Sequence, residues 1–361
     1  MRRLVAAACA MGLGLGFSAA YAASASASTT IVVGPGQSIQ AAVNMANPGD
    51  TVLIKPGVYH QSVLIRKNGI TLRGSGDFLG GTVLEPPASF PKTLCNAAFG
   101  RTGVCILAKK VNTKTGAVIE PVRNDRVTAL YVAGFPGNGV FGYGTHGLRV
   151  TRVVAVNDGE YGISRFESTD TVFADDTAAG NEEAGFYVGD SPRADTVVRD
   201  SRAFGNQFGI FIRHARGIKV AHNRVWGNCE GILVLDDGQP GGVGNTNVWR
   251  NSVFRNNKFC PKHEETPVNL EGGGILLLGA THTRVVGNSV GGNAGKQINS
   301  GGILVVSAHA LTKGSDPQFD TIVGNTAYRD HPADLIWDGT GTGVNFFANH
   351  CKTSVPGGLC H

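Results

Sequence analysis

The sequence has few charged residues, and beyond its first segment it has no long apolar run. Only 16% of the 361 residues are Asp, Glu, Lys or Arg, whereas 52 are glycine. Between the short β-branched runs of the repeat units described below, no stretch shows the 3.6-residue apolar period of a helix. After residue 28 no run reaches the roughly 20 apolar residues of a membrane-spanning helix. We therefore expect a turn-rich, all-β protein without a membrane span.

Positive charge is also scarce. The formal net charge of +5 falls to about +3 once Arg2 and Arg3 are removed with a leader segment. So small an excess does not indicate nucleic-acid binding. No Cys-x-x-Cys spacing occurs either, which makes zinc the less favoured role for the cysteines.

Residues 1–28 have the pattern of a secretory signal peptide. Arg2 and Arg3 form the positive start, residues 4–17 the apolar core, and Ala20-Tyr21-Ala22 a small-x-small cleavage site. We expect cleavage after Ala22; a cut after Ala27 is the alternative. The mature protein is then secreted to the extracellular space.

Six cysteines remain after the signal. Proximity in the sequence pairs Cys95 with Cys105, Cys229 with Cys260 and Cys351 with Cys360, among the fifteen pairings that six cysteines allow. Three disulfides agree with an oxidising compartment.

An internal repeat dominates the middle of the chain. Glycines that open a short apolar run recur at steps of 23, 23, 24, 22, 43 and 28 residues, at Gly139, Gly162, Gly185, Gly209, Gly231, Gly274 and Gly302. A second column of mostly polar residues marks the turns at Arg152, Asp176, Ser201, Asn223, Asn251, Asn288 and Asn325. A third column follows five residues later, at Asn157, Asn181, Asn206, Asn228, Asn256, Asn293 and Asp330. We interpret these columns as stacked turns, because Asn tolerates left-handed backbone and hydrogen-bonds its neighbours.

Short strands that cannot bury a face alone must stack on the next copy. The repeat therefore predicts a right-handed parallel β-helix solenoid over residues 29–361, as a single domain. A leucine-rich solenoid fits poorly, because no Leu-x-x-Leu-x-Leu frame recurs. Ser38 begins a short amphipathic helix that we expect to cap the N-terminal end. Loop insertions are expected at about 76–126, 237–246, 258–273 and 308–318.

The opening of the mature chain resembles a known group. The runs Ser38-Ile-Gln-Ala-Ala, Pro48-Gly-Asp-Thr-Val-Leu-Ile-Lys-Pro-Gly-Val-Tyr and Gly69-Ile-Thr-Leu-Arg-Gly-Ser-Gly are similar to those of secreted parallel β-helix proteins of the pectin-lyase-like superfamily. The resemblance covers roughly residues 30–350. It implies the fold and a carbohydrate-related activity. The catalytic motifs of its epimerases, polygalacturonases and methylesterases are absent, so the resemblance assigns no catalytic residue.

An outward-facing apolar stripe is expected on one sheet, because side chains alternate along a strand. The second residue after each glycine is Phe141, Ser164, Tyr187, Phe211, Leu233, Leu276 or Leu304. We consider Tyr187 and Phe211 as a stacking platform for sugar rings, with loops packed over the stripe as the alternative.

The candidate catalytic residues are the fifth residues after the repeated glycines, positions that we call the fifth column. They are Glu167, Asp190, His214 and Asp236. These side chains would stand on rungs about 4.8 Å apart, where the repulsion of neighbouring carboxylates would push their pKa values apart. The imidazole of His214 between them would become a poised base. The separation expected for Asp190 and Asp236, about 9–10 Å, is close to that of an inverting glycosidase pair. Arg193, Arg213 and Asp237 lie beside them in the sequence, and Arg suits a uronic acid carboxylate. The alternative is a solvated turn ladder.

A second acidic row, Glu160, Glu183, Gln207 and Glu230, precedes the same strands and could hold calcium. No motif supports a cofactor. We expect a monomer that binds a polysaccharide or another extended glycan and cleaves or epimerises it, as a lyase, hydrolase or epimerase. The alternative is a non-catalytic glycan-binding or surface-structural module.

Overall fold

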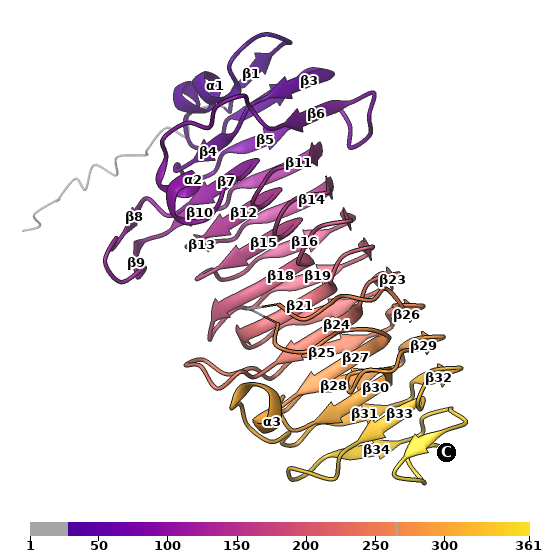
Figure 1. Cartoon of the computed structure of the whole chain (residues 1–361). Helices are drawn as coiled ribbons and strands as arrows, with labels where there is room; N and C mark the ends of the chain where they lie inside the picture. The colour runs from indigo at the N-terminus through magenta and orange to yellow at the C-terminus, as the bar shows by residue number, and fades with distance from the viewer. Residues whose placement is uncertain (1–27, 264–265) are drawn as a thin grey trace, which may run out of the picture.

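A computed structural model describes residues 28–263 and 266–361, so the expected signal segment lies almost wholly outside the described residues. The chain coils into an elongated stack of parallel strands, with the N-terminal and C-terminal coils at opposite ends (Figure 1). The predicted parallel β-helix is confirmed. No helix in the described residues is long and apolar enough to cross a membrane.

One face of the solenoid, here called sheet 1, contains the strands that follow the repeated glycines. Val140 pairs with Ile163, and Ile163 with Phe186, so the register matches the repeat seen in the sequence. Its strands are β4 (Val63–Ile65), β7 (Val104–Leu107), β12 (Val140–Tyr143), β15 (Ile163–Phe166), β18 (Ala184–Ser191), β21 (Phe208–Ala215), β24 (Glu230–Leu235), β27 (Gly273–Leu278), β30 (Gly301–Val306), β33 (Leu335–Trp337) and β35 (Ser354–Val355).

Sheet 2 is the next face along each coil. Its strands are mostly three residues long, and the middle residue points into the core. They are β1 (Thr30–Val33), β2 (Thr51–Ile54), β5 (Thr71–Arg73), β11 (Arg126–Ala133), β14 (Arg149–Val156), β16 (Val172–Ala174), β19 (Val197–Arg199), β22 (Lys219–Ala221), β25 (Asn247–Trp249), β28 (Arg284–Val286), β31 (Thr321–Val323) and β34 (Asn345–Phe347).

Sheet 3 completes the coil, and the long strands β11 and β14 run through both sheets 2 and 3. The other strands of sheet 3 are β3 (Gly57–His60), β6 (Thr82–Glu85), β17 (Thr177–Ala179), β20 (Arg202–Phe204), β23 (Arg224–Trp226), β26 (Ser252–Phe254), β29 (Ser289–Gly291) and β32 (Thr326–Tyr328). Outside the three faces lie the hairpin β8 (Lys110–Val111) with β9 (Val118–Glu120), and the short parallel pair β10 (Val122–Arg123) with β13 (Thr145–His146).

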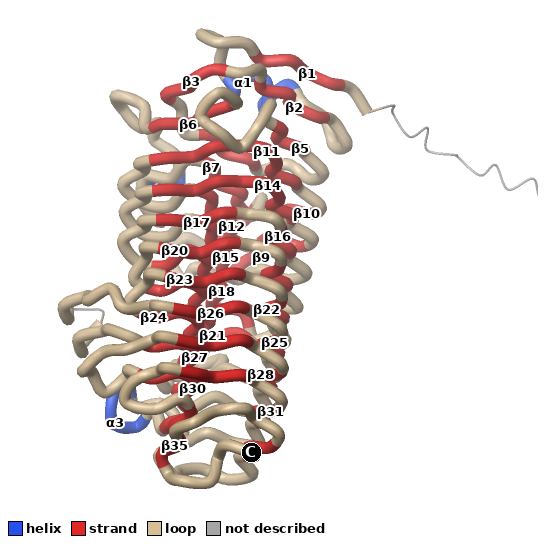
Figure 2. Tube along the Cα trace, turned by 90° about the vertical axis from the view of Figure 1, so that its right-hand side faces the viewer, coloured by secondary structure: helices blue, strands red, loops and turns tan. Residues whose placement is uncertain are grey.

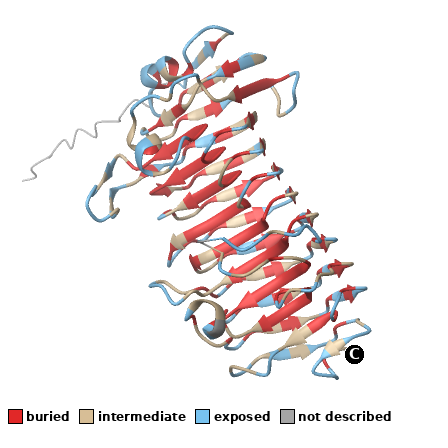
Figure 3. Cartoon of the chain, in the orientation of Figure 1, coloured by how far each residue is buried: buried red, intermediate tan, exposed pale blue. Residues whose placement is uncertain are grey.

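The interior is a continuous column of mainly Val, Ile, Leu and Ala side chains enclosed by the three sheets. The strands carry most of the buried residues (Figure 3). Helix α1 (Ile39–Met45) covers its N-terminal end and buries Ile39, Ala42 and Val43, as predicted for a capping helix. The Ser38 hydroxyl accepts a hydrogen bond from the Ala41 N–H at 3.1 Å and so begins the helix.

Two buried polar ladders hold the turns on either side of sheet 3. In one ladder Asn223 donates its backbone N–H and its amide to Asn251 Oδ1, at 2.9 and 3.0 Å. In the other, Asn206 donates to Asn228 Oδ1 in the same way. The predicted structural role of these columns is confirmed. At the N-terminal end the ladder residue is Asp158 and not Asn157, because Asn157 takes the left-handed turn position at φ 56°.

The three expected disulfides are present and join Cys95 to Cys105, Cys229 to Cys260 and Cys351 to Cys360. The first anchors α2 (Leu94–Ala98) to β7, and the second holds the loop after β26 against sheet 1. Loops project from the regular coils on the side that carries this second loop and α3 (His309–Thr312) (Figure 2).

Candidate functional site

The outward face of sheet 1 carries a second apolar layer that is separate from the solenoid core. Phe141 packs with residues of the α2 and β8–β9 region, whereas Tyr187, Phe211 and Leu233 pack in a second cluster. Val268, Leu270 and Leu311 come from the inserted loops and cover that second cluster. The stripe is therefore covered by loops, which was the alternative to an open platform.

Tyr187 is fully buried, which corrects the expectation that its ring is a surface platform for sugars. Its ring stacks on Tyr161 and Phe166, with centroids 4.5 and 4.6 Å apart, and meets Phe211 edge-on. Inserted loops and neighbouring rungs exclude solvent from this ring. Burial is the usual state of so large an apolar surface. Phe211 is also buried, at 4% exposure, but it lines a cavity.

That cavity lies between the aromatic layer and the inserted loops and has a volume of about 430 Å³. Ligand pockets of about 300–1,000 Å³ are typical of small-molecule and sugar sites. Its walls are mainly apolar, and its polar groups come from Glu160, Glu183 and Arg213, with Thr266 and Thr312 from the loops. We call this space the sheet 1 cavity.

Arg213 is the cation of the cavity. It follows Phe211 and Ile212 on β21, and its guanidinium lies 5.8 Å from the Phe211 ring centroid and 6.0 Å from that of Tyr187. Asp237 Oδ2 is 3.8 Å from its Nη1, and one third of the side chain remains exposed. A guanidinium held against aromatic rings and partly open to the cavity is suited to a carboxylate.

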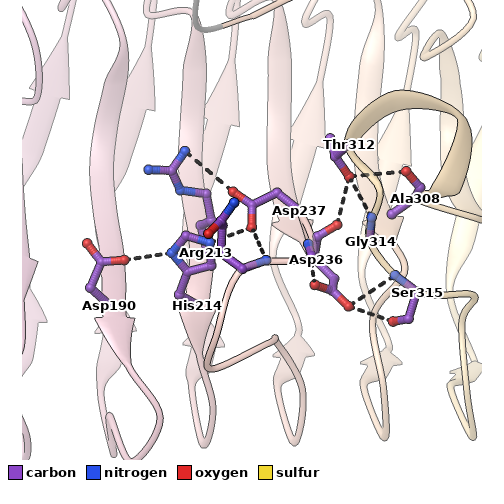
Figure 4. Close-up of polar contacts among 11 residues, drawn as sticks. Asp190, Arg213, His214, Asp236, Asp237, Ala308, Thr312, Gly314 and Ser315 are labelled. Carbon is purple, nitrogen blue, oxygen red and sulfur yellow. Dashed lines mark hydrogen bonds and ion pairs between the residues drawn. The ribbon is translucent and has the colours of Figure 1, made fainter.

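Next to Arg213, His214 lies between two carboxylates (Figure 4). Its Nδ1 is 2.6 Å from Asp190 Oδ1, and its Nε2 is 2.5 Å from Asp237 Oδ1. A neutral imidazole has one N–H donor, so hydrogen bonds to two carboxylates favour the form in which both nitrogens carry a proton. Burial opposes this charge, but the hydrogen bonds to Asp190 and Asp237 outweigh it and raise the pKa of His214.

This geometry corrects two expectations. Both ring nitrogens of His214 are engaged by carboxylates, so neither is free to accept a proton from a substrate as a poised base would. Asp236 does not face it; its carboxylate accepts hydrogen bonds from the Ser315 hydroxyl at 2.6 Å and from the Gly238 N–H at 3.0 Å. The chain leaves the regular coil at this insertion, so Asp237 takes the place next to the imidazole.

The fifth column is set by backbone geometry. Gly144, Glu167, Asp190, His214 and Gly279 all have φ between 46° and 64°, the left-handed turn conformation. Asp and Asn adopt this conformation more readily than most residues, and Gly does so freely. The turn thus accounts for part of the polar pattern, as the alternative of a turn ladder predicted. It does not account for the contact of His214 with two carboxylates.

Glu167 is the other titratable group of the column. Burial raises its pKa, and the neighbouring Asp190 carboxylate raises it further, against the opposing effect of Arg165. Arg193 is exposed, and it is not among the residues that line the cavity.

Arg165 was missed in the sequence because it occupies an inward position that is aliphatic in most repeats. It is fully buried and donates to the carbonyls of Gly189 at 3.0 Å and Ala194 at 3.2 Å, and also to that of Ser168. Burial lowers its pKa to about 9. The one available signal was that Arg165 interrupts the aliphatic residues found at the third position after most of the repeated glycines.

The second acidic row divides into two parts. Glu160 and Glu183 border both the cavity and an adjoining hollow of about 450 Å³, where Gln207 and His263 lie 3.3 Å apart. Glu230 is instead buried against the Asn299 amide. Among the described residues no three His, Cys, Asp or Glu side chains are grouped as a metal site.

Comparisons with known proteins agree with this architecture. The family described as "Right handed beta helix region" matches residues 137–328. No curated protein matches the chain.

Solved structures of similar fold include an alginate lyase from Paenibacillus sp. str. FPU-7, at 17% identity and a TM-score of 0.57 over 88% of this chain and 99% of that one. The Dettilon tailspike protein has 14% identity and a TM-score of 0.61, over 91% of this chain and 60% of its own. The A-module of a mannuronan C-5 epimerase from Azotobacter vinelandii has 18% identity and a TM-score of 0.55, over 88% and 86%. At such identities the likeness concerns the fold.

Proposed function

We propose, from the premise that this chain belongs to the right-handed β-helix family, that it is an exported protein whose sheet 1 cavity binds part of an acidic polysaccharide. The observation that carries the proposal is the position of Arg213 in an aromatic cavity, with its guanidinium partly open. Export is supported by the leader pattern of residues 1–28 and by three disulfides.

Each wall of the cavity has a task in this proposal. The rings of Tyr161, Phe208 and Phe211 offer apolar contact to the C–H faces of a sugar. Arg213 pairs with the carboxylate of a uronic acid unit, which displaces the 3.8 Å contact to Asp237. The imidazolium of His214 keeps Asp237 in place through its Nε2 hydrogen bond.

Catalysis is the second part of the proposal. The observation that favours it is the position of Glu167, on the turn directly after the cavity-lining Phe166 and not inside the cavity itself. Partial burial and the neighbouring Asp190 raise its pKa toward the range of a general acid. Glu167 would move a proton at a sugar unit that extends from the cavity over this turn, while Asp190 stays hydrogen-bonded to His214. Cleavage by elimination, hydrolysis and epimerisation all use such a group.

The proposal is tested by a glycan array with the mature protein, the Arg213→Gln variant and an Arg202→Gln control. Arg202 is exposed on sheet 3, so its replacement by Gln removes the same charge far from the cavity. We expect Arg213→Gln to weaken binding to uronate polymers about tenfold or more, because a charge-assisted pair contributes about 1.5–3 kcal/mol. Equal binding by both variants contradicts the cavity as the site.

Turnover is measured on the polymer that binds, by ultraviolet absorbance for elimination and by reducing ends for hydrolysis. Glu167→Gln should bind as the wild type does and lose turnover. Binding without turnover by the wild-type protein favours the non-catalytic module.

A further inference from the structure

A second concave surface lies on sheet 2, on a different face from the sheet 1 cavity. It is a groove of about 730 Å³ lined by outward residues of β5, β11, β14, β16 and β19, which follow one another along the solenoid. Each strand contributes three residues to sheet 2, and the middle one of the three is buried. The first and third residues form two outward rows. Thr128 and Thr151, joined by a 3.0 Å hydrogen bond, lie in the groove between the arginines.

Five arginines border this groove, namely Arg73, Arg126, Arg149, Arg152 and Arg199. No Asp or Glu is among the groove-lining residues. Arg149 pairs with Asp170 at 3.2 Å, and Arg199 with Asp200 at 2.5 Å, so two of the charges are compensated at the rim.

The other three guanidiniums are exposed, and within the described ranges they form no ion pair. Asp175, on the turn one rung after that of Arg152, is exposed as well and is not paired with it. The groove therefore keeps an excess of positive charge on a chain that is nearly neutral after loss of its leader.

The same face continues into a second hollow of about 710 Å³. Val197 of the groove pairs in register with Lys219, and Lys219 with Asn247, so the two hollows lie on consecutive rungs. Trp249, Arg250 and Lys219 border the second hollow, which adds an indole ring to the row of cations.

We propose that the outward face of sheet 2 is a second binding surface, which holds an extended acidic polysaccharide along the solenoid axis. The planar guanidinium matches carboxylate and sulfate groups, and all five cations of the groove are arginine. They are spread over rungs about 4.8 Å apart, which suits a polymer of repeated anions and not one small anion. This surface goes beyond the sheet 1 cavity and does not depend on it.

A nucleic acid is the less favoured occupant. Among the residues that line the groove and the second hollow, Trp249 is the one aromatic ring, whereas single-strand binding relies on stacking successive bases on several rings. Proteins that bind duplexes through phosphates also tend to carry a larger positive charge than this chain does.

The test uses fluorescent polygalacturonate as the probe, with dextran as the uncharged polymer, at low and at physiological salt. The groove variant is Arg73→Gln/Arg126→Gln/Arg152→Gln in the full mature chain. Arg202→Gln/Arg255→Gln/Arg329→Gln is the matched control, because it removes the same charge from exposed positions on and beside sheet 3. Both triple variants are also measured in the Arg213→Gln background, which separates the groove from the cavity.

We expect the groove variant to bind polygalacturonate about tenfold more weakly at low salt in both backgrounds, since three exposed charge pairs contribute up to about 1 kcal/mol each. The control should change binding less than twofold, and added salt should narrow the difference. Equal losses in groove and control variants would reduce the effect to net charge and overturn the proposal. Tighter binding of single-stranded DNA than of polygalacturonate would overturn the assignment of the occupant.

Discussion

The imidazole Nδ1 of His214 lies 2.6 Å from Oδ1 of Asp190, on the preceding rung of sheet 1. On its other side, Nε2 of the same ring meets Asp237. A titratable ring thus links two rungs of the solenoid and the loop that begins at residue 237, next to the cation of the sheet 1 cavity.

The first prediction concerns the charge on His214. Asp237→Asn removes one of the two carboxylates that raise its pKa, so the pKa of His214 should fall. An NMR titration of the ring resonances measures this. Asp236→Asn is the control, because Asp236 bonds Ser315 and Gly238 and does not touch the ring. The same shift in both variants would refute the arrangement.

Stability should depend on pH through the same residue. The pKa of His214 is raised in the folded state, so its contribution is fully present below the ordinary value of 6.5 and is lost as the pH rises through the raised value. Replacing His214 by Gln should therefore cost more stability at pH 5.5 than at pH 9. Urea unfolding at both values measures the difference, and a cost independent of pH would contradict the imidazolium.

The polar ladder contains an acid where a neutral side chain fits better. Asp176 is buried and accepts the Val153 N–H at 2.8 Å, and burial raises its pKa well above the ordinary range. Wild-type stability should thus fall as the pH rises from about 4. Asp176→Asn should add about 1–3 kcal/mol at pH 8 and much less at pH 4.

The control for this substitution is the neighbouring Asp175→Asn, since Asp175 is exposed. Asn also has a partner at position 176 by analogy, because Asn223 and Asn251 each donate to the carbonyl of a buried valine on the preceding rung. A gain from Asp175→Asn of equal size would point to surface charge and not to the ladder.

Tyr187 should act through packing. Tyr187→Ala should lower the free energy of unfolding by about 3–5 kcal/mol, as is usual for a buried aromatic ring. Tyr187→Phe keeps the ring and should retain both glycan binding and most of the stability. Denaturant unfolding and the glycan array are read together. If Tyr187→Ala loses binding at unchanged stability, the ring contacts the glycan directly.

The disulfide of Cys229 with Cys260 should matter for the cavity cover. Its replacement by two alanines should loosen residues 258–273, which supply Val268 and Leu270 to the cover. We expect faster proteolysis in this loop, weaker glycan binding and a stability loss of about 3 kcal/mol. The pair Cys351 and Cys360, replaced in the same way, lies at the C-terminal end and should leave binding unchanged.

Much of the fold was predictable because its signals are local and repeated. The glycine spacing gave the register of Val140 with Ile163, and the Asn columns marked the ladder turns. The cavity was not predictable, since it depends on how the loops at 258–273 and 308–318 pack over sheet 1. Asp237, and not Asp236, contacts His214 because the chain leaves the regular coil at this point. The repeat pattern does not predict where that happens.

The polar ladders have a direction. Each ladder residue donates its backbone N–H to a side chain on the following rung, as Asn206 does to Asn228. The backbone N–H of a ladder residue is therefore hydrogen-bonded only when the following coil is in place. At the end of one ladder Asp330 donates instead to Asp334, only four residues on, so this coil supplies its own acceptor. The other ladder runs one rung further, from Asn325 to Asn349. The ladders therefore run in one direction along the solenoid, and one of them ends on an acceptor within its own coil.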